Sequence, residues 1–221
     1  MKDLFEDITE IPAVRKETAA VELVDCAVEY RRAYGVQQLM KVMGVDAPRE
    51  NCTYHIFTGG NVDMVSHVRW MLHVYGSLSV VTISAWDIAL ADIMLLKRWV
   101  DRGDIGRIDI IVGDRFPAKH PREWERMREW QARCVHFDVV ADGVHARFVA
   151  ALTSNGDGLV LTSSAACTTN PRVELATFTD SIELYDFYMA QVREWKRLRL
   201  ERKVRNEIDD LVTDTEMEDI V

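Results

Sequence analysis

The sequence has little glycine and proline, 11 and 5 among 221 residues. That scarcity excludes a collagen-like repeat and a broadly disordered chain. Its four cysteines, Cys26, Cys52, Cys134 and Cys167, stand far apart and form no C-x-x-C pair. Such spacing is untypical of a secreted disulfide framework or a zinc site, so we expect reduced thiols and no metal.

The sequence also has no long hydrophobic run. Its most apolar window, residues 83–96, contains Asp87 and Asp92 and is too short to cross a bilayer. The first residues are acidic and carry no apolar stretch, so we expect no signal peptide. These absences predict a cytoplasmic protein with no membrane association.

Hydrophobic residues make up 48% of the chain, enough for a sizeable core, while the acidic charge gathers at one end. From residue 206 onward there are seven Asp or Glu residues and no Lys or Arg. Without those seven acids the formal charge changes from −9 to about −2. The sequence therefore predicts an acidic, disordered tail over residues 206–221.

Apolar periodicity and β-branched residues predict strands that first alternate with helices and then follow one another. The strands are expected at residues 53–57, 78–84, 107–112, 134–140, 145–152, 159–163 and 175–178. Helices are expected at 61–75, capped by Asn61, at 86–100, from 121, and from 180, capped by Asp180. A further helix is expected at about 18–43, packed outside the central unit.

This order predicts an α/β fold, a mixed sheet flanked by helices on both faces. No linker rich in Pro, Gly or Ser interrupts the body of the chain. We divide it into an amino-terminal helical extension (1–50), one central domain (51–205) and the acidic tail (206–221).

The residues best suited to chemistry follow residue 144. If residues 145–152 form a strand, His145 and Arg147 point to the same face, because side chains alternate along a strand. The Asn-Gly-Asp-Gly stretch at 155–158 predicts a hairpin that returns the next strand antiparallel. Small residues then follow Leu161, and Glu174 lies beyond them. One face is thus expected to present an imidazole, a guanidinium, the hydroxyl of Ser164 and a carboxylate.

Such a set suits phosphodiester chemistry. Histidine can attack phosphorus because the pKa of an imidazole lies near neutrality. A neighbouring cation offsets charge on the phosphate oxygens, and a carboxylate orients the imidazole tautomer.

The segment resembles the HxK…GSxN motif of the phospholipase D superfamily, which includes phospholipases, phosphatidyltransferases and nucleases. The resemblance extends from about Thr53 to Trp195 and implies a half-site domain of that superfamily. It implies that His145 is the nucleophile, Arg147 and Ser164 bind phosphate, and Glu174 supports the histidine. The covalent histidine route implies no cofactor.

The motif departs from the family pattern at several positions. Arg147 replaces a lysine, a change that keeps the charge but alters the hydrogen-bonding geometry. Ser163 replaces a glycine, Ala166 replaces an asparagine, and Leu152 stands where an aspartate is expected.

Two functions follow from the resemblance. The first is a phosphodiesterase that acts on nucleic acid through a histidine nucleophile, with an altered motif. The alternative is a catalytically inactive module that binds nucleic acid or protein. Because the family's site uses two histidines and this chain carries one motif, the resemblance implies a homodimer.

A cationic run precedes the acidic tail. Residues 193–205 carry seven Lys or Arg side chains. By default, such a run indicates a helix end exposed to solvent. The alternative is that these cations contact nucleic-acid phosphates. The candidate nucleic-acid-binding residues are Arg193, Lys196, Arg197, Arg199, Arg202 and Lys203.

Overall fold

The structure is a computed structural model. It describes residues 28–33, 39, 41, 43, 48–49, 52–59, 62–165, 167 and 173–218. For residues 28–33, 59, 203 and 206–218 only the backbone is described.

The described residues form one mixed sheet of eight strands in the order β1-β2-β8-β7-β6-β3-β4-β5. β3, β4 and β5 run parallel, as do β1 and β2, while β6, β7 and β8 join the two parallel groups through antiparallel pairs. The strands are β1 (Val28–Ala33), β2 (Thr53–Gly59), β3 (Leu78–Ala85), β4 (Ile108–Gly113), β5 (Phe137–Asp142), β6 (Phe148–Thr153), β7 (Gly158–Ser163) and β8 (Val173–Asp180).

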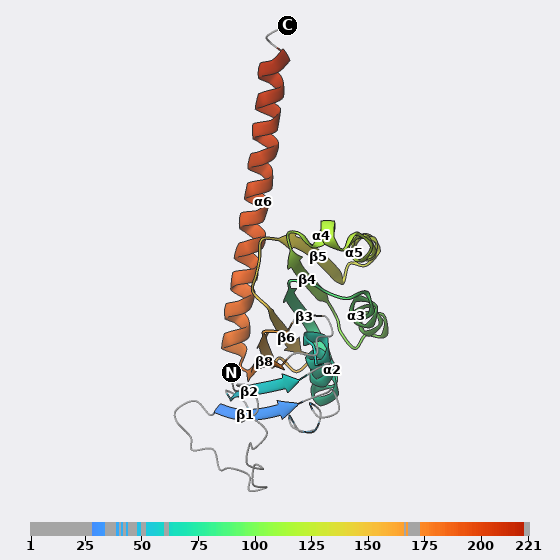
Figure 1. Ribbon diagram of the computed structural model, residues 1–221, viewed down its shortest axis with the longest axis vertical. Coiled ribbons are helices and arrows are strands. Elements are labelled where there is room, and N and C mark those ends of the chain that lie inside the picture. The colour runs from blue at the N-terminus through green and yellow to red at the C-terminus, as the bar shows by residue number, and fades with distance from the viewer. Residues whose placement is uncertain are drawn as a thin grey trace, which may run out of the picture.

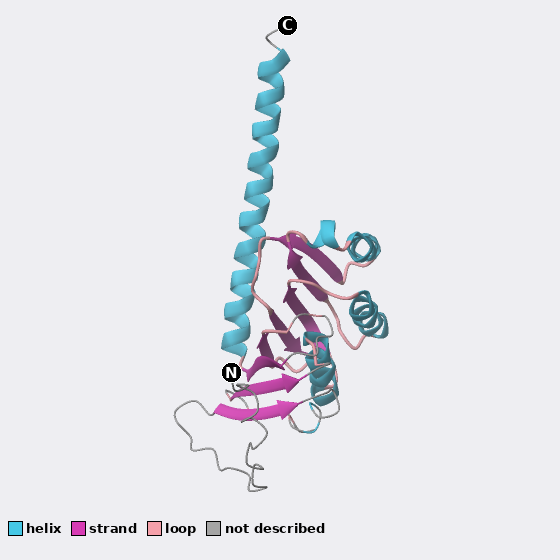
Figure 2. Cartoon of the chain, viewed as in Figure 1, coloured by secondary structure: helices cyan, strands magenta, loops and turns pink. Residues whose placement is uncertain are grey.

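Helices cover both faces of this sheet, as Figures 1 and 2 show. One face carries α2 (Met64–Tyr75), α3 (Leu90–Arg102) and α5 (Pro121–Arg133), with the short α4 (Phe116–Lys119) before α5. The long α6 (Ile182–Glu218) lies along the opposite face. The predicted fold class, a mixed sheet with helices on both faces, is confirmed.

The two faces bury separate hydrophobic clusters. Under α2, Trp70 packs edge-on against Phe178 of β8, with ring centroids 4.9 Å apart. Under α5, Trp130 stacks on Phe137 of β5 at 3.7 Å. The face under α6 is smaller and buries Ile111, Phe148, Ala150, Val160, Tyr185 and Val192. Residues of both faces alternate along the central strands, so those strands read as continuous apolar runs.

The hairpin between β6 and β7 forms where the sequence predicts it. Gly156 adopts a φ of 97°, a backbone conformation that favours glycine. The hydroxyl of Thr153 donates to the Asp157 carboxylate at 2.9 Å and accepts from the Asp157 backbone N–H at 2.9 Å. Val149 then faces Leu161 across the antiparallel ladder. The turn therefore fixes the register of these strands.

Several local predictions were wrong. Residues 28–33 form strand β1 inside the range expected to be helical, and the residues before 28 lie outside the described part. The backbone of α6 continues to Glu218, so residues 206–218 are helical rather than disordered. Asp63 caps α2 by accepting from the Ser66 N–H at 2.7 Å, whereas Asn61 lies outside the described residues.

The start of α6 also differs from the prediction. Asp180 ends β8 and accepts a hydrogen bond from the Tyr75 hydroxyl at 2.8 Å, so it does not cap the helix. The hydroxyl of Ser181 takes that place, since it accepts from the Leu184 N–H at 3.3 Å. The cap is therefore one residue later than expected.

Glycine at position 158 lets α6 approach the sheet closely. A Cβ atom there would lie 2.6 Å from the Cα of Ile182 and 2.8 Å from the Cβ of Tyr185. We expect Gly158→Ala to lower the free energy of unfolding by about 1–3 kcal/mol, because backbone atoms must shift. Urea denaturation measures the change. Gly143→Ala is the matched control, since its new methyl meets no atom within 4 Å; equal stability of both variants would contradict this packing.

Candidate phosphate-binding site

The four residues predicted to form a site lie near one edge of the sheet. The parallel strands β3 and β4 end there at Ala85 and Gly113. Ser84 pairs with Phe148, so β6 begins at the same edge, where β7 ends at Ser163 and β8 begins at Val173. In open α/β sheets, ligands bind outside the carboxyl ends of the parallel strands.

One geometric step of the sequence argument was wrong. Strand β6 begins at Phe148, and residues 144–147 belong to no strand. The carbonyl oxygen of Ala146 accepts a hydrogen bond from the Ser84 hydroxyl at 2.7 Å, which fixes this connection to β3. Strand alternation therefore does not relate His145 to Arg147.

Hydrogen bonds to Ser164 link three of the four predicted residues. The guanidinium of Arg147 donates to the backbone carbonyl of Ser164. The Ser164 hydroxyl donates to the Glu174 carboxylate and accepts from the Leu175 N–H at 3.0 Å. A second backbone bond, from the Ser164 N–H to the Leu175 carbonyl at 2.9 Å, holds the residue against β8. A cation, a hydroxyl and a carboxylate thus meet at this edge.

One N–H donor of the Arg147 guanidinium, at Nε, makes no hydrogen bond to the described residues. This nitrogen is buried. A buried N–H without a partner costs free energy, so an acceptor at this nitrogen would be stabilising. An oxyanion is the acceptor that guanidinium groups bind best.

His145 stands apart from this group. Its side chain is exposed, and its ring lies 4.6 Å from the ring of Trp86, tilted by 49°. Within the described residues, no hydrogen bond joins His145 to Arg147, Ser164 or Glu174. Instead it lines a hollow of about 310 Å³ with Trp195 and Arg202 of α6. The structure therefore brings three of the predicted residues together. The imidazole of His145 is close to Arg147 in the sequence but makes no hydrogen bond to these three residues.

Trp86, whose ring lies beside that of His145, was not singled out from the sequence. It is only half-buried, directly after β3, and its ring also meets the backbone at Gly113, where a Cβ would lie 3.4 Å away. The next residue, Asp87, accepts from the Lys119 ammonium at 2.8 Å, and Nε2 of His120 lies 3.3 Å away. The signal was an aromatic and an acidic residue together at a strand end, a place that commonly faces a ligand.

Several of the predicted nucleic-acid-binding cations form ion pairs with carboxylates. Lys196 lies between Asp109 and Asp138, at 3.1 and 2.9 Å. Arg197 pairs with Glu194 and Glu201 of its own helix, and Arg202 reaches Asp142 of β5 at 3.3 Å. Arg193 and Arg199 are exposed, and the side chain of Lys203 lies outside the described set. Three of the six therefore already hold carboxylate partners.

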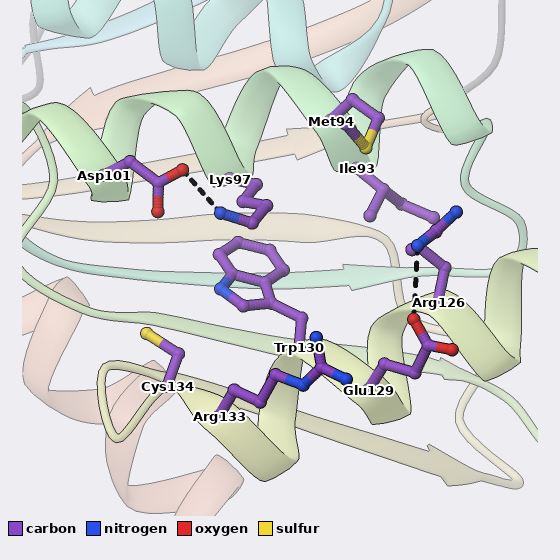
Figure 3. Close-up of a pocket in the computed structure, with 9 residues that line it drawn as sticks. All are labelled: Ile93, Met94, Lys97, Asp101, Arg126, Glu129, Trp130, Arg133 and Cys134. Atoms are coloured by element: carbon purple, nitrogen blue, oxygen red, sulfur yellow. Dashed lines mark hydrogen bonds and ion pairs between the residues drawn. The ribbon is translucent and has the colours of Figure 1, made fainter.

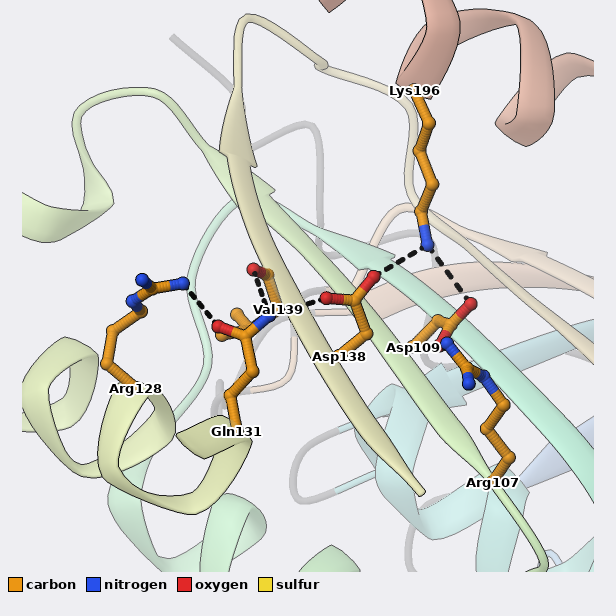
Figure 4. Close-up of polar contacts among 7 residues, drawn as sticks. All are labelled: Arg107, Asp109, Arg128, Gln131, Asp138, Val139 and Lys196. Carbon is orange, nitrogen blue, oxygen red and sulfur yellow. Dashed lines mark hydrogen bonds and ion pairs between the residues drawn. The ribbon is translucent and has the colours of Figure 1, made fainter. Parts of the chain in front are cut away.

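Lys196 belongs to a partly buried polar network that joins α6 to the sheet (Figure 4). Asp109 also accepts from Arg107 at 2.9 Å, and Asp138 accepts from Gln131 of α5. Burial alone would raise the pKa of Asp138, but the hydrogen bond and charge of Lys196 bring it below its usual value. Burial lowers the pKa of Lys196, and the two carboxylates more than offset this and raise it.

A separate hollow of about 380 Å³ lies between α3 and α5 (Figure 3). The Lys97 ammonium lies 5.9 Å from the centre of the Trp130 ring on one side of it. Arg126 and Glu129, joined at 3.2 Å, lie on the other side, with Cys134 at the end of α5. None of the predicted site residues lines this hollow.

Other titratable groups gather near the start of α3. Burial, with a smaller contribution from Asp63, raises the pKa of Asp92 to about 7. Burial likewise raises the pKa of the Cys167 thiol and lowers that of His67. Among the described residues, no three His, Cys, Asp or Glu side chains are grouped so as to hold a metal ion. In the same residues, no helix is long and apolar enough to span a membrane.

No model of a known protein family matches the sequence, and no curated protein matches it. Solved structures do resemble it. A phospholipase D family member, Nuc from Salmonella typhimurium, is 12% identical over 65% of this chain and 95% of its own, with a TM-score of 0.47. Polyphosphate kinase from Porphyromonas gingivalis is 16% identical, with a TM-score of 0.45, over 62% of this chain and 25% of that enzyme.

A third similar structure is phosphatidylserine synthase from Haemophilus influenzae, 9% identical, with a TM-score of 0.40, over 66% of this chain and 38% of its own. The chain thus spans well under half of the kinase and the synthase. At these identities the likeness concerns the fold alone.

The ion pairs of Lys196 with Asp109 and Asp138 can be tested as a link between α6 and the sheet. Replacing Lys196 by Met leaves Asp109, which is 7% exposed, without its second cation. We expect a loss of about 2–3 kcal/mol in the free energy of unfolding, because a buried carboxylate loses one of its two cationic partners. Thermal and urea unfolding at pH 7 measure it.

Lys97→Met is the matched control, since Lys97 pairs with Asp101 on the exposed face of α3 and its loss should cost under about 0.5 kcal/mol. The depressed pKa of Asp138 stabilises the fold above the ordinary carboxyl pKa of about 4, and this contribution is lost as pH falls through the folded-state pKa. The Lys196→Met deficit should therefore shrink in acid. Equal losses in both variants would contradict the network.

Proposed function

We propose that this chain is a phospholipase D-like phosphodiesterase that acts on nucleic acid, with His145 as its nucleophile. The observation that carries the proposal is the contact of Arg147, Ser164 and Glu174 at the edge where the parallel strands end. His145 precedes this group by two residues in a connection tied to β3.

Each residue then has a defined task. An imidazole nitrogen of His145 attacks phosphorus, so an N–P bond forms and the bond to the leaving oxygen breaks. The charge of Arg147 stabilises the negative oxygens of the transferring group. Glu174 holds the hydroxyl of Ser164, and water then cleaves the N–P bond to release the phosphate product.

The leaving oxygen needs a proton, and the chain carries one such motif. We assign the proton donor to a second copy of His145, supplied by a homodimer. The exposure of His145 supports this, because a buried imidazole could not face a second subunit. No metal enters the scheme, since the histidine and the guanidinium supply both attack and charge stabilisation.

Nucleic acid is the proposed substrate class for two reasons. Arg193 and Arg199 expose cationic groups on α6, the helix that also lines the hollow beside His145. Trp86 offers a half-buried aromatic ring against which a base can stack.

The test is cleavage of labelled single-stranded and duplex DNA and RNA in excess EDTA. We expect activity in the wild type and a loss of at least about 10²-fold in His145→Ala, because the nucleophile is removed. His136→Ala, an exposed histidine before β5, is the control and should keep full activity. Radiolabel trapped on His145 after acid-free quenching would identify the intermediate. Cleavage that persists in His145→Ala removes this mechanism.

The alternative is an inactive module of the same fold that binds nucleic acid or a protein. One observation favours it: the guanidinium of Arg147 is already engaged by the Ser164 carbonyl. The double variant Arg147→Lys/Ala166→Asn distinguishes the two functions, since it restores the family pattern at both positions. Higher activity supports the enzyme. An inert double variant, with DNA binding by the wild type, supports the module.

A further inference from the structure

A hollow of about 540 Å³ lies between α2 and α3, near the carboxyl ends of both helices. Strands β3 and β4 follow these helices in the chain, so the hollow lies toward the edge of the sheet where the two strands begin. The candidate phosphate-binding site is at the opposite edge, and the eight residues of β3 separate the two edges by about 25 Å. The hollow is therefore a different part of the molecule from the site described above.

Cationic side chains reach this hollow from both helices. Arg69 and His73 line it from α2, and Arg98 and Arg102 line it from α3. Each pair has a spacing of four residues, which places both side chains on the same side of their helix. All four residues are exposed. Two helices thus present three guanidinium groups and an imidazole to one hollow.

Little negative charge offsets these groups. Among the described residues that line the hollow, Asp104 is the one acid, and it already accepts a hydrogen bond from Nε of Arg102 at 2.8 Å. Arg69 and Arg98 form no hydrogen bond or ion pair with the described part of the chain. The whole chain, in contrast, is acidic, with a formal net charge of −9. A local excess of positive charge around a hollow attracts anions, so we looked for the kind of anion that fits it.

The helix dipole explains only part of this arrangement. The carboxyl end of a helix carries partial negative charge, which favours a cation in the last turn. That effect accounts for His73 and Arg102, which lie in the last turns of α2 and α3. Arg69 and Arg98 lie a full turn earlier, where the effect has faded. Stabilisation of the helix ends therefore leaves these two arginines unexplained.

We propose that this hollow binds a small anion with two or three adjacent phosphate groups, such as inorganic triphosphate or the phosphate chain of a nucleotide. Guanidinium groups bind phosphate oxygens through paired N–H donors, so three of them suit a ligand whose oxygens lie close together. The volume of about 540 Å³ is in the range of small-molecule sites. Nucleic acid is the competing ligand, but its charges are spread along a strand, whereas these arginines surround one hollow. The site does not depend on the proposed function.

Titration of the full chain with inorganic triphosphate, followed by calorimetry in metal-free buffer at physiological salt, tests this site. We expect the wild type to bind triphosphate, and Arg69→Gln/Arg98→Gln to bind it at least about tenfold more weakly, because two guanidinium groups are lost. Orthophosphate should bind more weakly than triphosphate, since it carries less charge. A parallel titration with ATP separates the two sources: tighter binding of ATP identifies a nucleotide, and tighter binding of triphosphate identifies the inorganic anion.

Two controls locate the bound anion. Arg122→Gln/Arg133→Gln removes the same charge from exposed positions of α5 and should bind triphosphate as the wild type does. His145→Ala should also keep full affinity, because the candidate phosphate-binding site lies at the other edge of the sheet. The proposal fails if the wild type does not bind triphosphate, if both arginine pairs lose affinity equally, or if His145→Ala loses it. It also fails if a short oligonucleotide displaces triphosphate at a lower concentration than ATP does.

A chemical measurement on the wild type makes the test independent of how the variants fold. Phenylglyoxal modifies exposed guanidinium groups, and mass spectrometry identifies the modified residues. We expect bound triphosphate to slow the modification of Arg69 and Arg98 several-fold and to leave that of Arg122 unchanged. Equal modification of Arg69 and Arg98 with and without triphosphate would show that the anion does not occupy this hollow.

Discussion

The antiparallel ladder of β6, β7 and β8 is the constraint on which the candidate site depends. The turn at residues 154–157 fixes the register of β6 against β7, and β7 then pairs Ser163 with Ala176 of β8. These two registers place Arg147, Ser164 and Glu174 side by side, although Glu174 is 27 residues from Arg147 in the numbering. A slip of one residue would send every side chain of a strand to the other face and separate the three.

The second face of the sheet depends on α6. Tyr185 and Val192 cover Phe148 and Val160 of the two central antiparallel strands. The charge of Lys196 then neutralises the carboxylates of Asp109 and Asp138, which the sheet presents to this helix. The same helix lines the hollow beside His145. The packing of the sheet and the lining of this hollow therefore share one element.

Much of the fold could be predicted from the sequence because its signals are local. Seven strands and four helices follow from apolar runs and periodicity, and the hairpin follows from Asn155-Gly156. The amino-terminal range was misassigned as helix because β1 is stabilised by pairing with β2, which is not a local property. Residues 206–218 were expected to be disordered from their acidity, yet they continue a helix that is nucleated by packing upstream.

The candidate site was chosen by motif, and its geometry could be predicted only in part. The sheet links Arg147 and Glu174 through hydrogen bonds to Ser164. The orientation of His145 could not be predicted, because His145 lies in the segment before β6. The Ser84 hydroxyl fixes this segment by donating a hydrogen bond to the Ala146 carbonyl. The partners of Lys196 and Arg202 come from β4 and β5, so sequence spacing along α6 could not reveal that these cations are paired.

The central claim is that His145 and the Arg147 group form one phosphate-binding site. A crystal soaked in tungstate, a phosphate analogue with strong scattering, tests it most directly. The account predicts one oxyanion within hydrogen-bonding distance of both the His145 ring and the Arg147 guanidinium. An empty edge at saturating tungstate, or an oxyanion held only by the cations of α6, would contradict it.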